Sequence, residues 1–266
     1  MQQPESESIS FDRAVSFYDQ TRGLPPGVAE EIAASLLFHL PDLAQILEIG
    51  IGTGRIAKPF LQRGLRVAGI DLSARMMGRL LETLPSATSH PLLAQADAAR
   101  LPLAADRFDA VIGVHVFHLI AGWQEALLEV HRVLRTGGSL LVGYDDRPGP
   151  TEHERTAAQW VRLVTARYPQ YSRPGIQELD ALKKALLASG ASLEEWVAAE
   201  WTTEGHIGRY IDFLEQRIFS STWQIPDEVL QPAIAELRQW ALQEFGSLDK
   251  PLPMQRVFIW QRYRWP

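Results

Sequence analysis

The chain has 266 residues, of which 46% are apolar and 22% are charged, and its formal net charge at pH 7 is −6. The negative charge argues against nonspecific binding to nucleic acid or anionic membranes, because both need a positive field. The absence of cysteine excludes disulfides, thiolate nucleophiles and cysteine-ligated zinc. The N-terminus does not resemble a secretory signal and no stretch has the length of a membrane span, so we expect a cytoplasmic protein without a membrane span.

The first half of the chain alternates between apolar strands and amphipathic helices. Strands are expected at 44–50, 66–72, 91–97, the start of 108–120, and 139–146; helices are expected from 11 to about 18 and at 28–40, 55–64, 73–85 and 123–138. Ser73 is the predicted N-cap of one helix, and a glycine pair is expected to end the helix at 123–138. This alternation predicts a parallel sheet covered on both faces, with ligands bound at the carboxyl ends of its strands.

The second half is mainly helical. Helices are expected at 151–169, 176–190, 206–223 and 226–246, with a strand within 192–204. Residues 255–265 alternate apolar and polar side chains as an edge strand would. We interpret residues 1–266 as a single domain, with a cofactor-binding core at 10–150 and a helical insertion at 205–250 that caps the substrate site.

The stretch ILEIGIGTGRIA, residues 46–57, is a glycine-rich turn between a strand and a helix. Glycines permit a positive φ and close approach of a ligand; here they are Gly50, Gly52 and Gly54. Arg55 stands where a dinucleotide turn has its third glycine, and the phosphate-loop pattern is absent. Glu48 precedes the turn, where a carboxylate would repel a pyrophosphate and favour a ligand that bears an ammonium group.

Acidic residues also end the next two predicted strands. Asp71 is placed to accept hydrogen bonds from a ribose diol, although it could instead cap the helix that starts near Ser73. Asp97 could accept a hydrogen bond from an adenine amine while the Ala98 N–H donates to the ring. The alternative for Asp97 is a solvated loop acid.

Four motifs in order, ILEIGIGTGRIA, VAGIDLS, QADAARLPLAADRFDAVIGVHVFHLI and HRVLRTGGSLLVG, resemble those of class I S-adenosylmethionine-dependent methyltransferases. The similarity is closest to the small-molecule branch with ubiquinone/menaquinone-biosynthesis-type enzymes, and it covers about residues 11–145. It implies an α/β, Rossmann-like, doubly wound sheet of seven mostly parallel strands whose last strand is antiparallel, which fits 255–265. It also implies that S-adenosyl-L-methionine is the cofactor.

The resemblance assigns cofactor contacts by position. The implied cofactor-binding residues are Tyr18, Arg22, Glu48, Gly50, Gly52, Gly54, Asp71, Leu72, Met76, Asp97, Ala98, Val114 and His115. In this set the segment with Tyr18 and Arg22 folds over the cofactor, while Leu72 and Met76 flank the adenine. Val114 and His115 face the methionine portion.

Methyl transfer needs a general base only when the acceptor holds its proton at neutral pH. The catalytic residue is therefore unknown. His115 and His118 are the main candidates, and Tyr144 and Asp145 are further candidate bases near the predicted strand ends. A hydrogen-bonded structural histidine is the alternative. No metal is expected, because the two histidines have no evident third ligand.

The most favoured function is methyl transfer to a small-molecule acceptor by a monomer or homodimer. A non-catalytic S-adenosylmethionine-binding regulatory module is one alternative. A nicotinamide-dependent oxidoreductase is another, disfavoured by Arg55 and Glu48. A nucleic-acid methyltransferase is disfavoured by the negative charge. It is also disfavoured because the chain has VHVFH after the fourth strand, where an Asn/Asp-Pro-Pro-aromatic motif would be expected.

Overall fold

The computed structural model describes residues 7–86, 88–146, 151–172 and 174–266. The chain divides into two compact units. Unit 1 comprises Met1–Asp145, Pro174–Glu200 and Phe258–Pro266, and unit 2 comprises Asp146–Arg173 and Trp201–Val257. The predicted insertion at 205–250 falls within the sequence range of unit 2, and its role as a cap stays a prediction.

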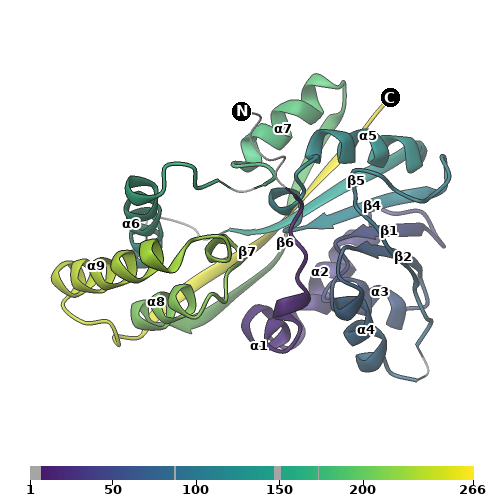
Figure 1. Cartoon of the computed structure of the whole chain (residues 1–266). Helices are drawn as coiled ribbons and strands as arrows, with labels where there is room; N and C mark the ends of the chain where they lie inside the picture. The colour runs from purple at the N-terminus through teal and green to yellow at the C-terminus, as the bar shows by residue number, and fades with distance from the viewer. Residues whose placement is uncertain (1–6, 87, 147–150, 173) are drawn as a thin grey trace. The chain divides into compact units, whose positions relative to one another are not determined.

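The strands form a seven-stranded sheet in the order β3-β2-β1-β4-β5-β7-β6 (Figure 1). Six strands are parallel and β7 is antiparallel to them, which confirms the predicted fold class. The strands are β1 (Gln45–Ile49), β2 (Arg66–Asp71), β3 (Leu92–Gln95), β4 (Phe108–Val114), β5 (Leu134–Asp146), β6 (Ser192–Gly205) and β7 (Leu252–Arg264).

The central strands are buried on both faces. In β1, Ile46, Leu47 and Ile49 have no exposed surface, which explains why the strand is a continuous apolar run rather than an alternating one. Ile46 pairs with Val67 of β2 on one side and with Ala110 of β4 on the other. This parallel register brings the carboxyl ends of neighbouring strands to the same edge of the sheet.

The helical elements of unit 1 are η1 (Asp12–Ala14), α1 (Tyr18–Arg22), α2 (Val28–Leu37), α3 (Ala57–Gln62), α4 (Ala74–Thr83), η2 (Phe117–Leu119), α5 (Trp123–Val133) and α7 (Leu179–Ala188). The predicted N-cap of α4 is confirmed: the Ser73 hydroxyl accepts a hydrogen bond from the Met76 N–H at 3.0 Å. α5 ends earlier than predicted, because Leu134 is already extended and β5 begins there, so the glycine pair lies within β5.

The prediction that 255–265 is an edge strand is wrong. β7 lies between β5 and β6, so β6 is the outer strand. The polar positions that produced the alternating pattern are paired within the sheet. Gln261 Nε2 donates to Glu195 at 2.7 Å, and the Arg262 guanidinium lies 2.5 Å from Glu194. Trp260 and Tyr263 have no exposed surface, as expected for an interior strand.

Unit 2 contains α6 (Glu152–Arg167), α8 (Ile207–Glu215), η3 (Ser220–Thr222) and α9 (Asp227–Phe245). α6, α8 and α9 pack on one another around a core that includes Trp160, Ile211 and Leu237. The predicted helix at 206–223 is interrupted, because Arg217 adopts a left-handed conformation with a φ of 56° after α8. None of the helices in the described ranges has the length and apolar content needed to cross a membrane.

Candidate functional site

The turn after β1 depends on its three glycines for different reasons. Gly50, Gly52 and Gly54 all have a positive φ, of 68°, 53° and 75°. A Cβ on Gly50 would lie 2.5 Å from Val116, and one on Gly54 would lie 2.3 Å from Leu80. At Gly52 the nearest atom would be 3.5 Å away. Close packing therefore demands glycine at 50 and 54, whereas Gly52 is the position that leaves space for a ligand.

Asp71 connects this turn to the start of α4. Its Oδ2 accepts a hydrogen bond from the Gly52 N–H at 2.9 Å, and its Oδ1 accepts one from the Ser73 N–H at 2.8 Å. Burial raises the pKa of Asp71, and these two hydrogen bonds oppose that rise. Asp71 thus joins the turn to Ser73, and Ser73 rather than Asp71 caps α4. Each carboxylate oxygen keeps further lone pairs, so a ribose diol remains chemically compatible with this side chain.

Glu48 is a buried acid in β1. Glu48 is only 4% exposed, and its Oε2 atom has no hydrogen-bond partner within the described structure. Burial raises the pKa of Glu48 to about 8; Arg55 opposes this rise and Asp71 adds to it. The carboxyl is therefore mostly neutral at pH 7, so the expected repulsion of a pyrophosphate does not follow. The unpartnered oxygen does fit a hydrogen-bond donor such as an ammonium group.

Asp97 follows β3 and lies beside the N-terminal segment. Its Oδ1 accepts a hydrogen bond from the Ala99 N–H at 2.9 Å, and its Oδ2 accepts one from the Ser8 hydroxyl at 3.3 Å. Ser8 also accepts a hydrogen bond from the Ala121 N–H at 3.0 Å. Ala98 is buried. Asp97 is therefore a bonded part of the loop rather than a freely solvated acid.

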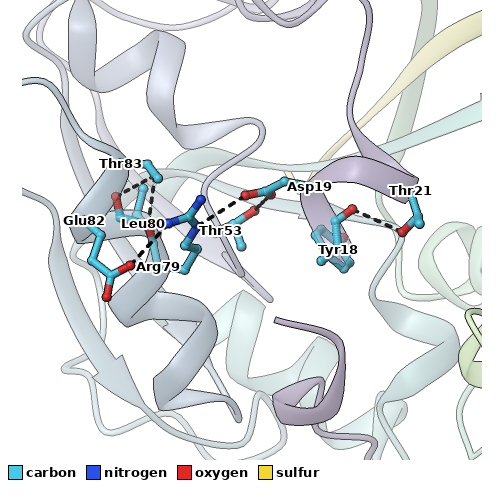
Figure 2. Close-up of polar contacts among 8 residues, drawn as sticks. All are labelled: Tyr18, Asp19, Thr21, Thr53, Arg79, Leu80, Glu82 and Thr83. Atoms are coloured by element: carbon cyan, nitrogen blue, oxygen red, sulfur yellow. Dashed lines mark hydrogen bonds and ion pairs between the residues drawn. The ribbon is translucent and has the colours of Figure 1, made fainter. Parts of the chain in front are cut away.

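The helix α1 carries Tyr18 and Arg22 and is bonded to the glycine turn. The Thr53 hydroxyl donates a 2.6 Å hydrogen bond to Asp19, whose other oxygen lies 3.8 Å from the Arg79 guanidinium (Figure 2). The Arg55 guanidinium donates to the Arg22 carbonyl at 3.0 Å. Sequence reasoning missed Asp19 and Thr53. A threonine within the glycine turn was the available signal.

A second missed feature holds the loop that follows Asp97. The Arg132 guanidinium donates to the carbonyls of Leu103 and Leu101, at 2.8 and 3.2 Å, and to Glu129 at 2.7 Å. Glu129 in turn accepts a hydrogen bond from the Leu101 N–H at 2.8 Å. α5 therefore fixes the position of this loop through two side chains one helical turn apart.

The two candidate histidines both follow β4 but differ in conformation and contacts. His115 follows Val114 directly and has a left-handed backbone with a φ of 50°, while His118 lies in the 3-10 turn η2. The His115 Nε2 atom is 2.6 Å from an Asp145 carboxylate oxygen at the end of β5. His118 contributes a backbone contact, because its carbonyl accepts a hydrogen bond from the Gly175 N–H at 3.2 Å.

Leu72 and Met76 are the two residues predicted to flank the adenine. The Leu72 carbonyl accepts a hydrogen bond from the Gln95 side chain at 2.9 Å, and Met76 is buried beside Gly52. The strand order β3-β2-β1-β4 thus brings Asp97, Asp71, Glu48 and His115 to adjacent strands of unit 1. Among the described residues there is no group of three or more side chains that could hold a metal ion.

Comparison with known proteins shows what the first half of this chain is similar to. Residues 47–142 match the methyltransferase domain family. The chain is 31% identical over 136 residues to malonyl-[acyl-carrier protein] O-methyltransferase from Enterobacter lignolyticus, covering 51% of this chain and 52% of that protein. It is 36% identical over 137 residues to ubiquinone/menaquinone biosynthesis C-methyltransferase from Syntrophotalea carbinolica, covering 50% and 58%. Residues 47–142 are therefore similar to a methyltransferase domain, and the predicted resemblance to S-adenosylmethionine-dependent methyltransferases is confirmed.

The fold is also similar to that of a solved methyltransferase structure. A phosphoethanolamine N-methyltransferase 2 from Haemonchus contortus, solved with phosphomonomethylethanolamine and S-adenosylhomocysteine, superposes with a TM-score of 0.55 at 17% identity. That comparison covers 96% of this chain and 58% of the other. The chain spans about half the length of the curated relatives it matches.

Proposed function

We propose that this chain transfers a methyl group from S-adenosylmethionine to a small-molecule acceptor. The observation that carries the proposal is the buried Glu48 carboxyl of β1, the strand that leads into the glycine turn, whose Oε2 lacks a partner within the described structure. An amino acid ammonium group would supply the missing donor and favour the ionised carboxylate. Neither a nicotinamide dinucleotide nor a nucleoside triphosphate carries such a group beside its phosphates.

The other predicted contacts suit the same ligand. Asp71 retains lone pairs for a ribose diol, and Asp97 retains lone pairs for an adenine amine. When bound, S-adenosylmethionine supplies a sulfonium-activated methyl group, so the residues of this chain need only bind, orient and exclude water. Tyr18 and Arg22, carried on α1 against the turn, are proposed to cover the bound cofactor.

The names of the relatives leave the acceptor open, since they describe O-, C- and N-methyltransferases. A regulatory module that binds the cofactor without transfer is the second candidate, and it shares every contact named above. Transfer of label from methyl-tritiated S-adenosylmethionine to small molecules separates the two.

Calorimetry with S-adenosylhomocysteine tests the cofactor assignment. At pH 7, in buffers that differ in ionisation enthalpy, we expect nearly one proton to be released per ligand bound, because the bound ammonium ionises Glu48. Glu48→Gln should release none and bind more weakly, while Glu30→Gln, an exposed glutamate of α2, should behave like the wild type. Binding of NAD without binding of S-adenosylhomocysteine would overturn the proposal.

A further inference from the structure

His115 occupies an unusual backbone conformation at the end of β4. Its φ of 50° lies in the left-handed region, which residues with a side chain rarely adopt. Such conformations persist where the surrounding structure imposes them, and they concentrate at functional sites. Here the result is a contact across 30 positions of sequence, between His115 on β4 and Asp145 on β5.

The contact determines which ring nitrogen of His115 carries the proton. Nε2 lies 2.6 Å from the Asp145 carboxylate, which can only accept a hydrogen bond. The Asp145 N–H also donates toward Nε2, at the longer distance of 3.4 Å. A lone pair on Nε2 would be repelled by the carboxylate oxygen at 2.6 Å, so the shorter contact assigns the proton to Nε2. In a neutral ring this leaves Nδ1 as a proton acceptor.

The burial of the two side chains suits the same arrangement. The Asp145 side chain is 13% exposed, whereas the His115 side chain is 36% exposed. A shielded carboxylate behind an accessible imidazole is the order in which a carboxylate orients a general base. Parallel pairing of Val114 with Gly143 keeps the two strand ends adjacent.

We propose that His115, oriented by Asp145, is the general base of the methyl transfer and that the acceptor is a hydroxyl group. This rests on the proposed function. The acceptor oxygen forms a bond to the methyl carbon as the carbon–sulfur bond breaks, and that bonding pair stays on sulfur. The hydroxyl proton passes to His115 Nδ1, giving an imidazolium paired with the Asp145 carboxylate, and is then lost to water.

The need for a base selects the acceptor class. A carboxylate is already ionised at neutral pH, and a free amine attacks through its lone pair and loses its proton afterwards. A hydroxyl oxygen gains most from losing its proton during attack. Asp145 is the positioning residue, and His115 is the group that meets the acceptor.

The ring tautomer provides a test that needs no acceptor. In chain labelled with ¹⁵N-histidine, we expect the His115 signals, assigned by their loss in His115→Gln, to show a protonated Nε2 and an unprotonated Nδ1. Asp145→Asn lets an amide donate to Nε2 and should move the proton to Nδ1. Asp42→Asn, an exposed carboxylate in the turn before β1, should leave the signals unchanged. A wild-type ring protonated on Nδ1, or one indifferent to Asp145→Asn, overturns the proposal.

The acceptor class is tested with methyl-tritiated S-adenosylmethionine and a small-molecule cell extract. We expect a labelled product that resists alkali but releases its methyl group as methyl iodide in hydriodic acid, as methyl ethers do. We also expect a 10²–10⁴-fold lower kcat for His115→Gln, the range of general-base catalysis. Asp145→Asn should lower kcat while its S-adenosylhomocysteine binding is retained. An alkali-labile ester as the labelled product, or a product whose methyl group resists the hydriodic acid that cleaves ethers, overturns the proposal. Failure of the wild type to bind S-adenosylhomocysteine counts instead against the proposed function. In that case the ¹⁵N measurement of the His115 tautomer still tests whether His115 is paired with Asp145.

Discussion

The Thr53 hydroxyl donates a 2.6 Å hydrogen bond to Asp19, and this contact joins the N-terminal helix α1 to the glycine turn (Figure 2). Thr53 is buried, so its hydroxyl has no access to water as an alternative partner. The attachment of α1 is therefore coupled to the conformation of the turn that is proposed to seat the cofactor.

Replacing Thr53 by valine removes this bond while keeping the shape of the side chain. We expect α1 to exchange its amide hydrogens faster and S-adenosylhomocysteine to bind about tenfold more weakly, because a hydrogen bond to a charged group contributes about 1.5–3 kcal/mol. Hydrogen exchange and calorimetry provide the measurements. Thr83→Val is the matched control, since the Thr83 hydroxyl bonds only to carbonyls of its own helix among its described hydrogen bonds. Equal exchange in the two variants would contradict the coupling.

The buried Glu48 predicts a stability that falls as pH rises. Its pKa is raised from 4.5 to about 8 in the folded chain, so between these values the folded state binds a proton that the unfolded state has lost. Stability from the neutral carboxyl is thus fully present below pH 4.5 and is lost as pH rises toward 8, by up to about 1.4 kcal/mol per pH unit.

Glu48→Gln should abolish this contribution. Free energies of unfolding measured by denaturant titration at pH 5, 6, 7 and 8 should fall more steeply for the wild type than for the variant. The difference between the two proteins is the quantity of interest, because other titrating groups cancel in it. A constant difference over this range would show that Glu48 ionises normally in the folded chain.

Substitutions at Gly54 and Gly52 are expected to have different effects on stability and on cofactor binding. Gly54→Ala places a Cβ 2.3 Å from Leu80 and should destabilise the fold by roughly 2–4 kcal/mol, from overpacking together with left-handed strain. Gly52→Ala meets no atom closer than 3.5 Å, so it should cost only the strain, about 1–2 kcal/mol.

The same Gly52→Ala variant should nevertheless lose most of its affinity for S-adenosylhomocysteine, since its new methyl group lies where a ligand would approach the backbone. Thermal unfolding and calorimetry on both variants provide the comparison. Full binding by folded Gly52→Ala would remove Gly52 from the proposed site.

Local sequence patterns were sufficient to predict the core elements of unit 1. The buried runs of β1 and β4, the Ser73 N-cap and the glycine turn each depend on neighbours within a few residues, where side-chain size and backbone freedom dominate. The acids at the carboxyl ends of β2 and β3 could be predicted to lie at one sheet edge, because parallel strands present their carboxyl ends together.

The sequence by itself determined the class of fold, the turn and the acids at the strand ends, since short-range periodicity and glycine placement encode them. Only the tertiary structure decided that β7 is interior, because a polar side chain paired across strands reads like a solvated one in the sequence. It alone also showed that burial raises the pKa of Glu48 and that His115 bonds to Asp145. Both properties depend on burial and on contacts between strands that no local pattern contains.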